Sequence, residues 1–83
     1  MENRFFINAF GSICYTVNSI YHREDGPAWE SSVGDKHWFI NGKHHRVDGP
    51  AVEWISGGKQ WFLNGIEYSK EEHSRLVKLK GFW

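Results

Sequence analysis

Residues 38–51 read WFINGKHHRVDGPA, and most of this stretch occurs twice in the chain. The segment 45–51 (HRVDGPA) repeats the segment 22–28 (HREDGPA), 23 residues further on and without a gap. The same spacing pairs other positions: Glu30 with Glu53, Gly34 with Gly57, Lys36 with Lys59, Trp38 with Trp61, Phe39 with Phe62, and Asn41-Gly42 with Asn64-Gly65. Chance does not give so many matches at one spacing, so the chain contains an internal repeat.

A weaker third copy precedes these two. The same step backwards aligns Gly34 with Gly11, Trp38 with Tyr15, Asn41 with Asn18, and His45 with His22. Terminal repeats are often atypical because they cap the stack. We therefore expect a single domain over residues 1–83: a degenerate N-terminal repeat (1–21), two repeats (22–44 and 45–68), and a C-terminal helix and tail (69–83).

Each repeat has the pattern of a β-hairpin. Asn-Gly at 41–42 and 64–65 strongly indicates a hairpin turn, since both residues tolerate positive φ. Gly34-Asp35 and Gly57-Gly58 mark a second turn, and strand-forming runs occupy 28–33, 36–40, 51–56 and 59–63. Pro27 and Pro50 donate no ladder hydrogen bond and predict a bulge or tight bend. The expected fold is mainly β (β+α): an antiparallel β-meander of 23-residue hairpin repeats with one C-terminal helix.

The helix is predicted over about residues 70–80. Ser69 and Glu72 form the S-x-x-E pattern of a capping box, and Gly81 ends the helix. Leu76, Val77 and Leu79, with His73, give a partly apolar face. We expect this helix to cover an end or face of the sheet, where an open edge would promote aggregation.

Composition excludes several classes of protein. Ten basic and ten acidic residues cancel, so no overall field attracts nucleic acid, and nucleic-acid binding is not favoured. No apolar run is long enough for a transmembrane helix, and we expect no membrane association. Cys14 is the only cysteine and lies between apolar neighbours, which predicts a buried thiol and a cytoplasmic protein.

The W-x-x-N-G-K-x-H pattern of residues 38–45 resembles the MORN repeat, a β-hairpin unit of the same length. The HRxDGPA segments depart from that family, which has a glycine-spaced H-G-x-G there. They are similar instead to NGKxHRxDGPA repeats of small proteins from tailed phages and giant viruses. The resemblance covers about residues 11–80 and implies scaffolding and protein binding, with lipid binding sometimes proposed, and no shared reaction.

The residues that recur in the repeats are assigned to the scaffold. A catalytic constellation is usually made once, whereas these residues recur at equivalent positions. The set comprises His22, Arg23, Asp25, Gly26, Pro27, His45, Arg46, Asp48, Gly49 and Pro50, with Trp38, Trp61, Asn41, Gly42, Asn64 and Gly65. Arg and Asp two residues apart can pair across the bend, and the histidine can bond to the neighbouring strand. The alternative is a ligand site repeated along the stack.

No cofactor, metal or catalytic residue is expected. His44 and His45 are adjacent in a predicted strand, so their side chains point to opposite faces and cannot readily ligate one ion. No serine or cysteine has the surroundings of a nucleophile. We therefore predict that the protein is not an enzyme.

Partner binding is assigned to aromatic and histidine residues that break the repeat or end the chain. This set comprises Trp29, Trp54, His37, His44, Phe82 and Trp83. Trp29 corresponds to Val52, and Trp54 to Ser31, so the repeat does not require either tryptophan. Large exposed aromatics anchor protein interfaces. The alternative is that the two tryptophans pack under the helix.

The resulting hypothesis is a non-catalytic protein-binding module. The resemblance suggests a small phage accessory or anti-defence protein that binds and inhibits a host immune effector or nuclease in the host cytoplasm. An unpaired edge strand offers a further binding mode, which also allows a homodimer. The alternative function is binding of a nucleic acid or nucleotide through the repeated His-Arg-x-Asp and aromatic residues.

Overall fold

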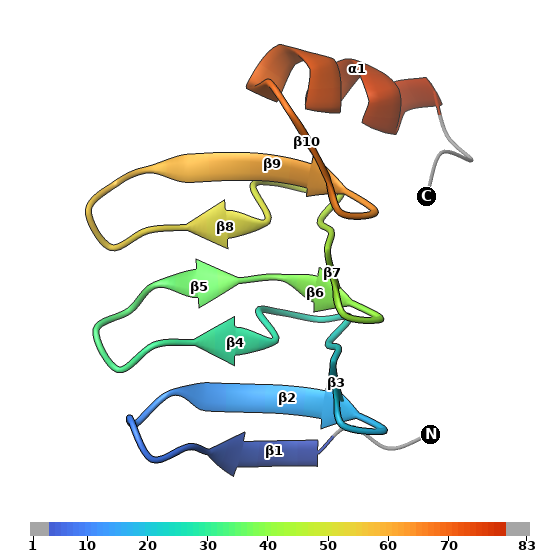
Figure 1. Cartoon of the computed structure of the whole chain (residues 1–83). Coiled ribbons are helices and arrows are strands. Elements are labelled where there is room, and N and C mark those ends of the chain that lie inside the picture. The colour runs from blue at the N-terminus through green and yellow to red at the C-terminus, as the bar shows by residue number, and fades with distance from the viewer. Residues whose placement is uncertain (1–3, 80–83) are drawn as a thin grey trace.

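The computed structural model describes residues 4–79, which form an antiparallel meander followed by one helix (Figure 1). Its elements are β1 (Arg4–Ile7), β2 (Ile13–Val17), β3 (Ile20–Tyr21), β4 (Trp29–Glu30), β5 (Lys36–His37), β6 (Phe39–Ile40), β7 (Lys43–His44), β8 (Val52–Glu53), β9 (Lys59–Leu63), β10 (Ile66–Tyr68) and α1 (Lys70–Leu79). The predicted fold class, mainly β with a C-terminal helix, is confirmed.

Three hairpins, β1–β2, β4–β5 and β8–β9, are joined edge to edge in chain order, and Figure 1 shows them stacked from the N-terminal end to the helical end. After each hairpin the chain reverses and forms a short strand, β3, β7 or β10. Strand β3 pairs with β2, β7 with β6, and β10 with β9. Every pairing is antiparallel, and β6 and β7 form a separate two-stranded sheet, so that in the main sheet β5 is followed by β8.

The backbone repeats every 23 residues in all three copies. Asn18, Asn41 and Asn64 have φ of 52°, 51° and 53°, and the residues that follow them, Ser19, Gly42 and Gly65, also have positive φ. This is the turn type expected for Asn-Gly hairpins. The other turn places Gly11, Gly34 and Gly57 at φ of 81°, 105° and 104°. The N-terminal copy thus keeps the backbone of the repeat although its sequence has diverged.

The predicted run 59–63 forms β9 over its full length, whereas the other three predicted runs form shorter strands. The run 28–33 contains only β4, because Ser31 begins a turn: its Oγ accepts hydrogen bonds from the backbone N of Val33 (3.3 Å) and Asp35 (3.0 Å). The run 36–40 divides into β5 and β6 at Trp38, whose backbone N donates to Ala51 O of the next repeat at 2.7 Å. Local turn chemistry and pairing between repeats therefore limit each strand.

The helix α1 begins with the predicted capping box. Ser69 Oγ accepts from the backbone N of Glu72 at 3.1 Å, and Glu72 Oε1 accepts from the backbone N of Ser69 at 3.3 Å. The helix packs against β9 and β10 at the end of the sheet (Figure 1). His73 is buried there, and its Nε2 lies 2.6 Å from Arg46 O. Leu79 is exposed, so the apolar face is narrower than predicted.

The molecule is thin, with extents of 38 × 33 × 17 Å, which fits a single layer of sheet. Its buried apolar residues are mostly small: Cys14, Val17, Ala28, Ala51, Val52 and Leu63. Cys14 is a buried free thiol, as predicted. Because so little fits inside the layer, most large aromatics lie half-buried on the two faces. No helix within residues 4–79 is long and apolar enough to cross a lipid bilayer.

Candidate functional site

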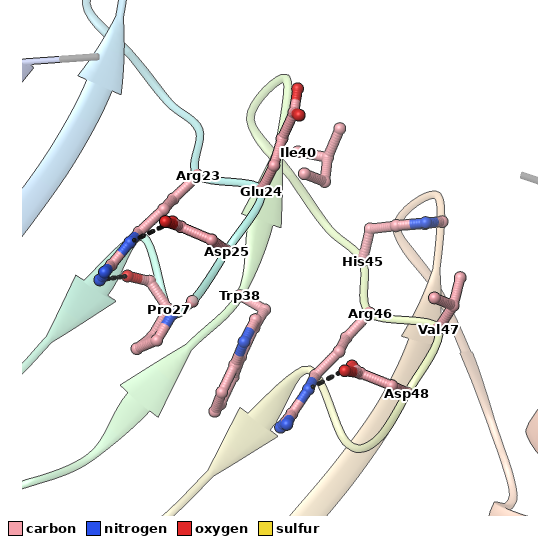
Figure 2. Close-up of a pocket in the computed structure, with 11 residues that line it drawn as sticks. Arg23, Glu24, Asp25, Pro27, Trp38, Ile40, His45, Arg46, Val47 and Asp48 are labelled. Carbon is pink, nitrogen blue, oxygen red and sulfur yellow. Dashed lines mark hydrogen bonds and ion pairs between the residues drawn. The ribbon is translucent and has the colours of Figure 1, made fainter.

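The arginine of each His-Arg-x-Asp segment is held by three contacts. Arg23 Nε donates to Asp25 Oδ1 at 2.9 Å, its NH1 donates to Pro27 O at 3.2 Å, and its guanidinium lies 4.0 Å from the centre of the Tyr15 ring. The second copy repeats all three contacts, at 2.9, 3.1 and 3.9 Å, with Arg46, Asp48, Pro50 and Trp38. Figure 2 shows the two arginine–aspartate pairs in successive loops.

The glycine of each Asp-Gly-Pro segment lies over this guanidinium. A Cβ on Gly26 would lie 2.9 Å from Arg23 Cζ, and a Cβ on Gly49 would lie 3.0 Å from Arg46 Cζ. The arginine is thus enclosed between an aromatic ring and a glycine backbone. The steric requirement of the arginine explains why glycine recurs in the bend beside proline.

The repeated histidine connects one repeat to the next. His22 Nδ1 accepts a hydrogen bond from the backbone N of Asn41 at 3.0 Å, and His45 Nδ1 accepts from the backbone N of Asn64 at 2.9 Å. A ring nitrogen that accepts a hydrogen bond carries no proton, so this contact requires the neutral Nε2–H tautomer of the imidazole. Burial, followed by the charge of His73, lowers the pKa of His45 and favours this neutral form.

Between the two loops lies a pocket of about 450 Å³, lined by Trp38, Ile40 and residues of both His-Arg-x-Asp segments (Figure 2). Its two guanidinium groups are already bonded to aspartates and backbone carbonyls. Arg46 also donates to Glu53 Oε2 at 3.0 Å. The pocket therefore presents polar groups whose main hydrogen bonds maintain the bends.

The other prominent cluster forms around His37 and consists mainly of residues that break the repeat. The His37 ring lies 4.9 Å from the Trp29 ring and 5.2 Å from the Trp54 ring, centre to centre, with both tryptophans nearly perpendicular to it. The His44 ring lies 5.3 Å from His37. We call this set the His37 cluster: Tyr21, Trp29, His37, Phe39, His44, Trp54 and Phe62.

Aromatic stacking extends the cluster across neighbouring repeats. Phe39 lies 4.3 Å from the His44 ring, and Phe62 lies 4.8 Å from it on the next repeat. Tyr21 stacks on Phe39 at 5.2 Å. A shallow pocket of about 290 Å³ opens between Tyr21, Trp29, His37, Phe39 and His44. This surface is mainly apolar and lacks charged side chains in its pocket.

His37 and His44 share a hydrogen bond of 3.0 Å between His37 Nδ1 and His44 Nε2. One ring must donate and the other accept, so the bond is lost if both rings carry two protons. Burial, followed by the charge of His44, lowers the pKa of His37, while Asp35 opposes this shift; burial also lowers the pKa of His44. Both imidazoles are therefore neutral at neutral pH.

These lowered pKa values link folding to pH. The unfolded chain binds protons on these histidines near their ordinary pKa of 6.5, whereas the folded chain binds them only at lower pH. The stabilising contribution is thus fully present above about pH 6.5. It declines as the pH falls from there through the folded-state pKa.

The structure brings together four of the predicted partner-binding residues: Trp29, His37, His44 and Trp54. Phe82 and Trp83 lie outside the described residues. The two tryptophans do not pack under the helix; the space beneath α1 is lined by the repeated Trp61 together with His73 and Val77. Trp54 is 41 % exposed, and its Nε1 donates to Gln60 Oε1 at 2.9 Å.

Three members of the cluster, Tyr21, Phe39 and Phe62, were not predicted as site residues. Phe39 and Phe62 occupy equivalent repeat positions, which favoured a purely structural assignment. The signal for Phe39 is its place two residues after His37, on whose ring it stacks at 6.1 Å, and Phe62 is the repeat equivalent of Phe39. Their ring contacts with His44 make them part of the same surface.

His44 and His45 lie on different sides of the sheet, since His44 lines the pocket of the His37 cluster and His45 lines the pocket of the arginine loops. Within residues 4–79 no three His, Cys, Asp or Glu side chains are grouped closely enough to hold a metal ion. Comparison with known proteins gives no matching family model, no matching curated protein and no matching solved structure.

Proposed function

We propose that the protein is a non-catalytic binding module that holds a partner protein on its His37 cluster. The observation that carries this proposal is the convergence of four residues that the repeat does not require, Trp29, His37, His44 and Trp54, on one half-exposed aromatic surface. Aromatic residues concentrate binding energy at protein interfaces because they bury a large area with few rotatable bonds.

The division of residues between scaffold and surface supports the proposal. The repeated His, Arg and Asp side chains are occupied by contacts within or between repeats. The fold keeps its backbone at the equivalent positions with Val52, Ser31 and Gln60 in place of Trp29, Trp54 and His37. The repeat fold therefore does not require these three side chains, and they can serve to bind a partner.

The nature of the partner follows from the surface and from the resemblance to phage repeat proteins. The pocket of the His37 cluster carries no charged side chain, and the chain has no net charge, which favours an uncharged protein surface over a polyanion. We propose a host protein as the partner, in the cytoplasm of a phage-infected cell. An immune effector or nuclease that the protein inhibits is the expected class.

The test is affinity capture from bacterial host lysate with repeat-matched variants. The bait is compared with Trp29→Val and Trp54→Ser, each of which installs the residue found at the equivalent position of another repeat. The fold already accommodates each replacement residue at the equivalent position of another repeat. Circular dichroism and thermal unfolding establish that each variant is folded, and every capture is made with and without nuclease treatment.

The proposal predicts one host protein retained in stoichiometric amounts after nuclease treatment, and lost in both folded variants. Recovery that disappears with nuclease treatment would instead support the nucleic-acid alternative, with the repeated His-Arg-x-Asp segments as the first place to look. Unchanged recovery in both variants would place the interface elsewhere on the protein.

A further inference from the structure

The strand β1 has a free edge that is covered at the equivalent place in both later repeats. Strand β1 is the first strand in the sheet order, and within the described residues it pairs only with β2. Phe5 is 57 % exposed, whereas the equivalent Ala28 and Ala51 are 0 % exposed. All four residues of β1, including Phe6 and Ile7, are exposed.

In the later repeats this edge receives a strand from the preceding repeat. The backbone N of Tyr15 donates to Ala28 O at 2.8 Å, and that of Trp38 donates to Ala51 O at 2.7 Å. Strand β2 pairs with β4, and β5 pairs with β8, in the same way. Phe5 lies 23 residues before Ala28, so its carbonyl occupies the position of these acceptors. The residues 4–79 contain no strand that donates to it.

We propose that β1 pairs with β1 of a second copy of this chain, so that the protein forms a two-fold symmetric dimer through a continuous sheet. Natural sheet edges usually carry charges or proline that oppose such pairing. Strand β1 carries one charge, on Arg4 at its start, and then presents Phe5, Phe6 and Ile7 in succession. The net charge of zero adds no overall repulsion between copies.

The opposite end of the sheet restricts the assembly to a closed pair. The helix α1 lies against β9 and β10 there, in the place where a further repeat would continue the stack. Head-to-tail growth would need that end to be open, so pairing between two identical β1 edges is the arrangement that the described elements leave. Identical surfaces that pair in this way form closed dimers.

We take the two β1 strands to pair antiparallel, as the strands within the chain do, and the two-fold axis of such a dimer is then perpendicular to the sheet. The two His37 clusters then face the same side and form a bivalent surface. A four-residue strand spans only about 14 Å. The interface is therefore small, and we expect reversible association in about the micromolar range rather than a permanent dimer. This inference does not depend on the proposed function.

Sedimentation equilibrium over a range of protein concentrations tests the dimer. The variant Phe5→Lys,Ile7→Lys places like charges across the paired edges and should shift the chain to monomer. The matched control is Ile66→Lys, which changes a residue of the same 57 % exposure on β10, at the other end of the stack. The dimer should persist in this control.

Single cysteines at positions 4, 5, 6 and 7 provide a positional readout when each is introduced into a Cys14→Ala chain, because Phe6 pairs with Cys14 across the β1–β2 hairpin. In a two-fold antiparallel pair one of these positions lies next to its own copy, so mild oxidation should cross-link that variant and leave Ile66→Cys monomeric. A chain that is monomeric at all concentrations would overturn the proposal. A dimer that is unaffected by Phe5→Lys,Ile7→Lys and forms no cross-link at positions 4–7 would overturn it as well.

Discussion

Replacement of Arg46 by alanine should be among the most destabilising changes of a partly exposed side chain in this protein. The guanidinium lies 3.9 Å from the centre of the Trp38 ring and donates to Asp48, the Pro50 carbonyl and Glu53 at 2.9, 3.1 and 3.0 Å. Loss of the cation–π contact costs about 1 kcal/mol, and loss of the carbonyl hydrogen bond costs about 1 kcal/mol.

The two carboxylate contacts add less, because Asp48 is largely exposed and solvent screens such pairs; together they contribute about 1 kcal/mol. The sum is a loss of about 3 kcal/mol in the free energy of unfolding. A small domain has a total stability of about 5–10 kcal/mol, so the effect is a large fraction of the whole.

Urea unfolding followed by circular dichroism measures this loss, and two other arginines provide the comparison. Arg23→Ala should cost about 2 kcal/mol, since Arg23 has the aromatic, aspartate and carbonyl contacts but, within residues 4–79, no second carboxylate partner like Glu53. Arg75 is exposed on α1, and Arg75→Ala should change stability by less than about 0.5 kcal/mol. An Arg46→Ala effect no larger than that of Arg75→Ala would refute the assignment of the repeated arginine to the scaffold.

Three further predictions concern the bend, the histidine pair and the helix. Gly49→Ala should destabilise the fold by about 1–2 kcal/mol because its Cβ meets Arg46, and the loss should largely disappear in an Arg46→Ala background, as a double-mutant cycle would show. The melting temperature should fall between pH 7.5 and 5.5, because protons bind more tightly to His37 and His44 in the unfolded chain; His37→Gln should flatten this dependence in a thermal scan at each pH. Ser69→Ala should cost about 1 kcal/mol and increase amide exchange in the first turn of α1, and unchanged exchange there would contradict the capping role.

The repeat made most of the fold predictable. Asn-Gly at 41–42 identified a turn whose φ values of 51° and 79° the structure confirms, and Ser69 with Glu72 located the start of the helix. Strand lengths were less predictable. The Ser31 hydroxyl, for example, bonds to the backbone N of Val33 and Asp35, and this turn ends the strand after Glu30. Such side-chain bonds are short in range and are not visible in a pattern of apolar residues.

The candidate site was only partly predictable. Deviation from the repeat identified Trp29 and Trp54, but it did not show that both meet His37. That meeting depends on the register of β4, β5 and β8, which places His37 opposite Trp29 on one side and Val52 on the other. Register between repeats is a property of the stacked hairpins and cannot be derived from any one repeat.

The most direct test of the division between scaffold and binding surface compares tryptophans within one molecule. In a two-dimensional NMR spectrum of the ¹⁵N-labelled chain, each tryptophan gives its own indole N–H signal, recorded with and without the captured host protein. We predict that the signals of Trp29 and Trp54 shift or broaden, while those of the repeated Trp38 and Trp61 change little. Perturbation of Trp38 and Trp61 with unchanged Trp29 and Trp54 would contradict the account and transfer the interface to the repeated residues.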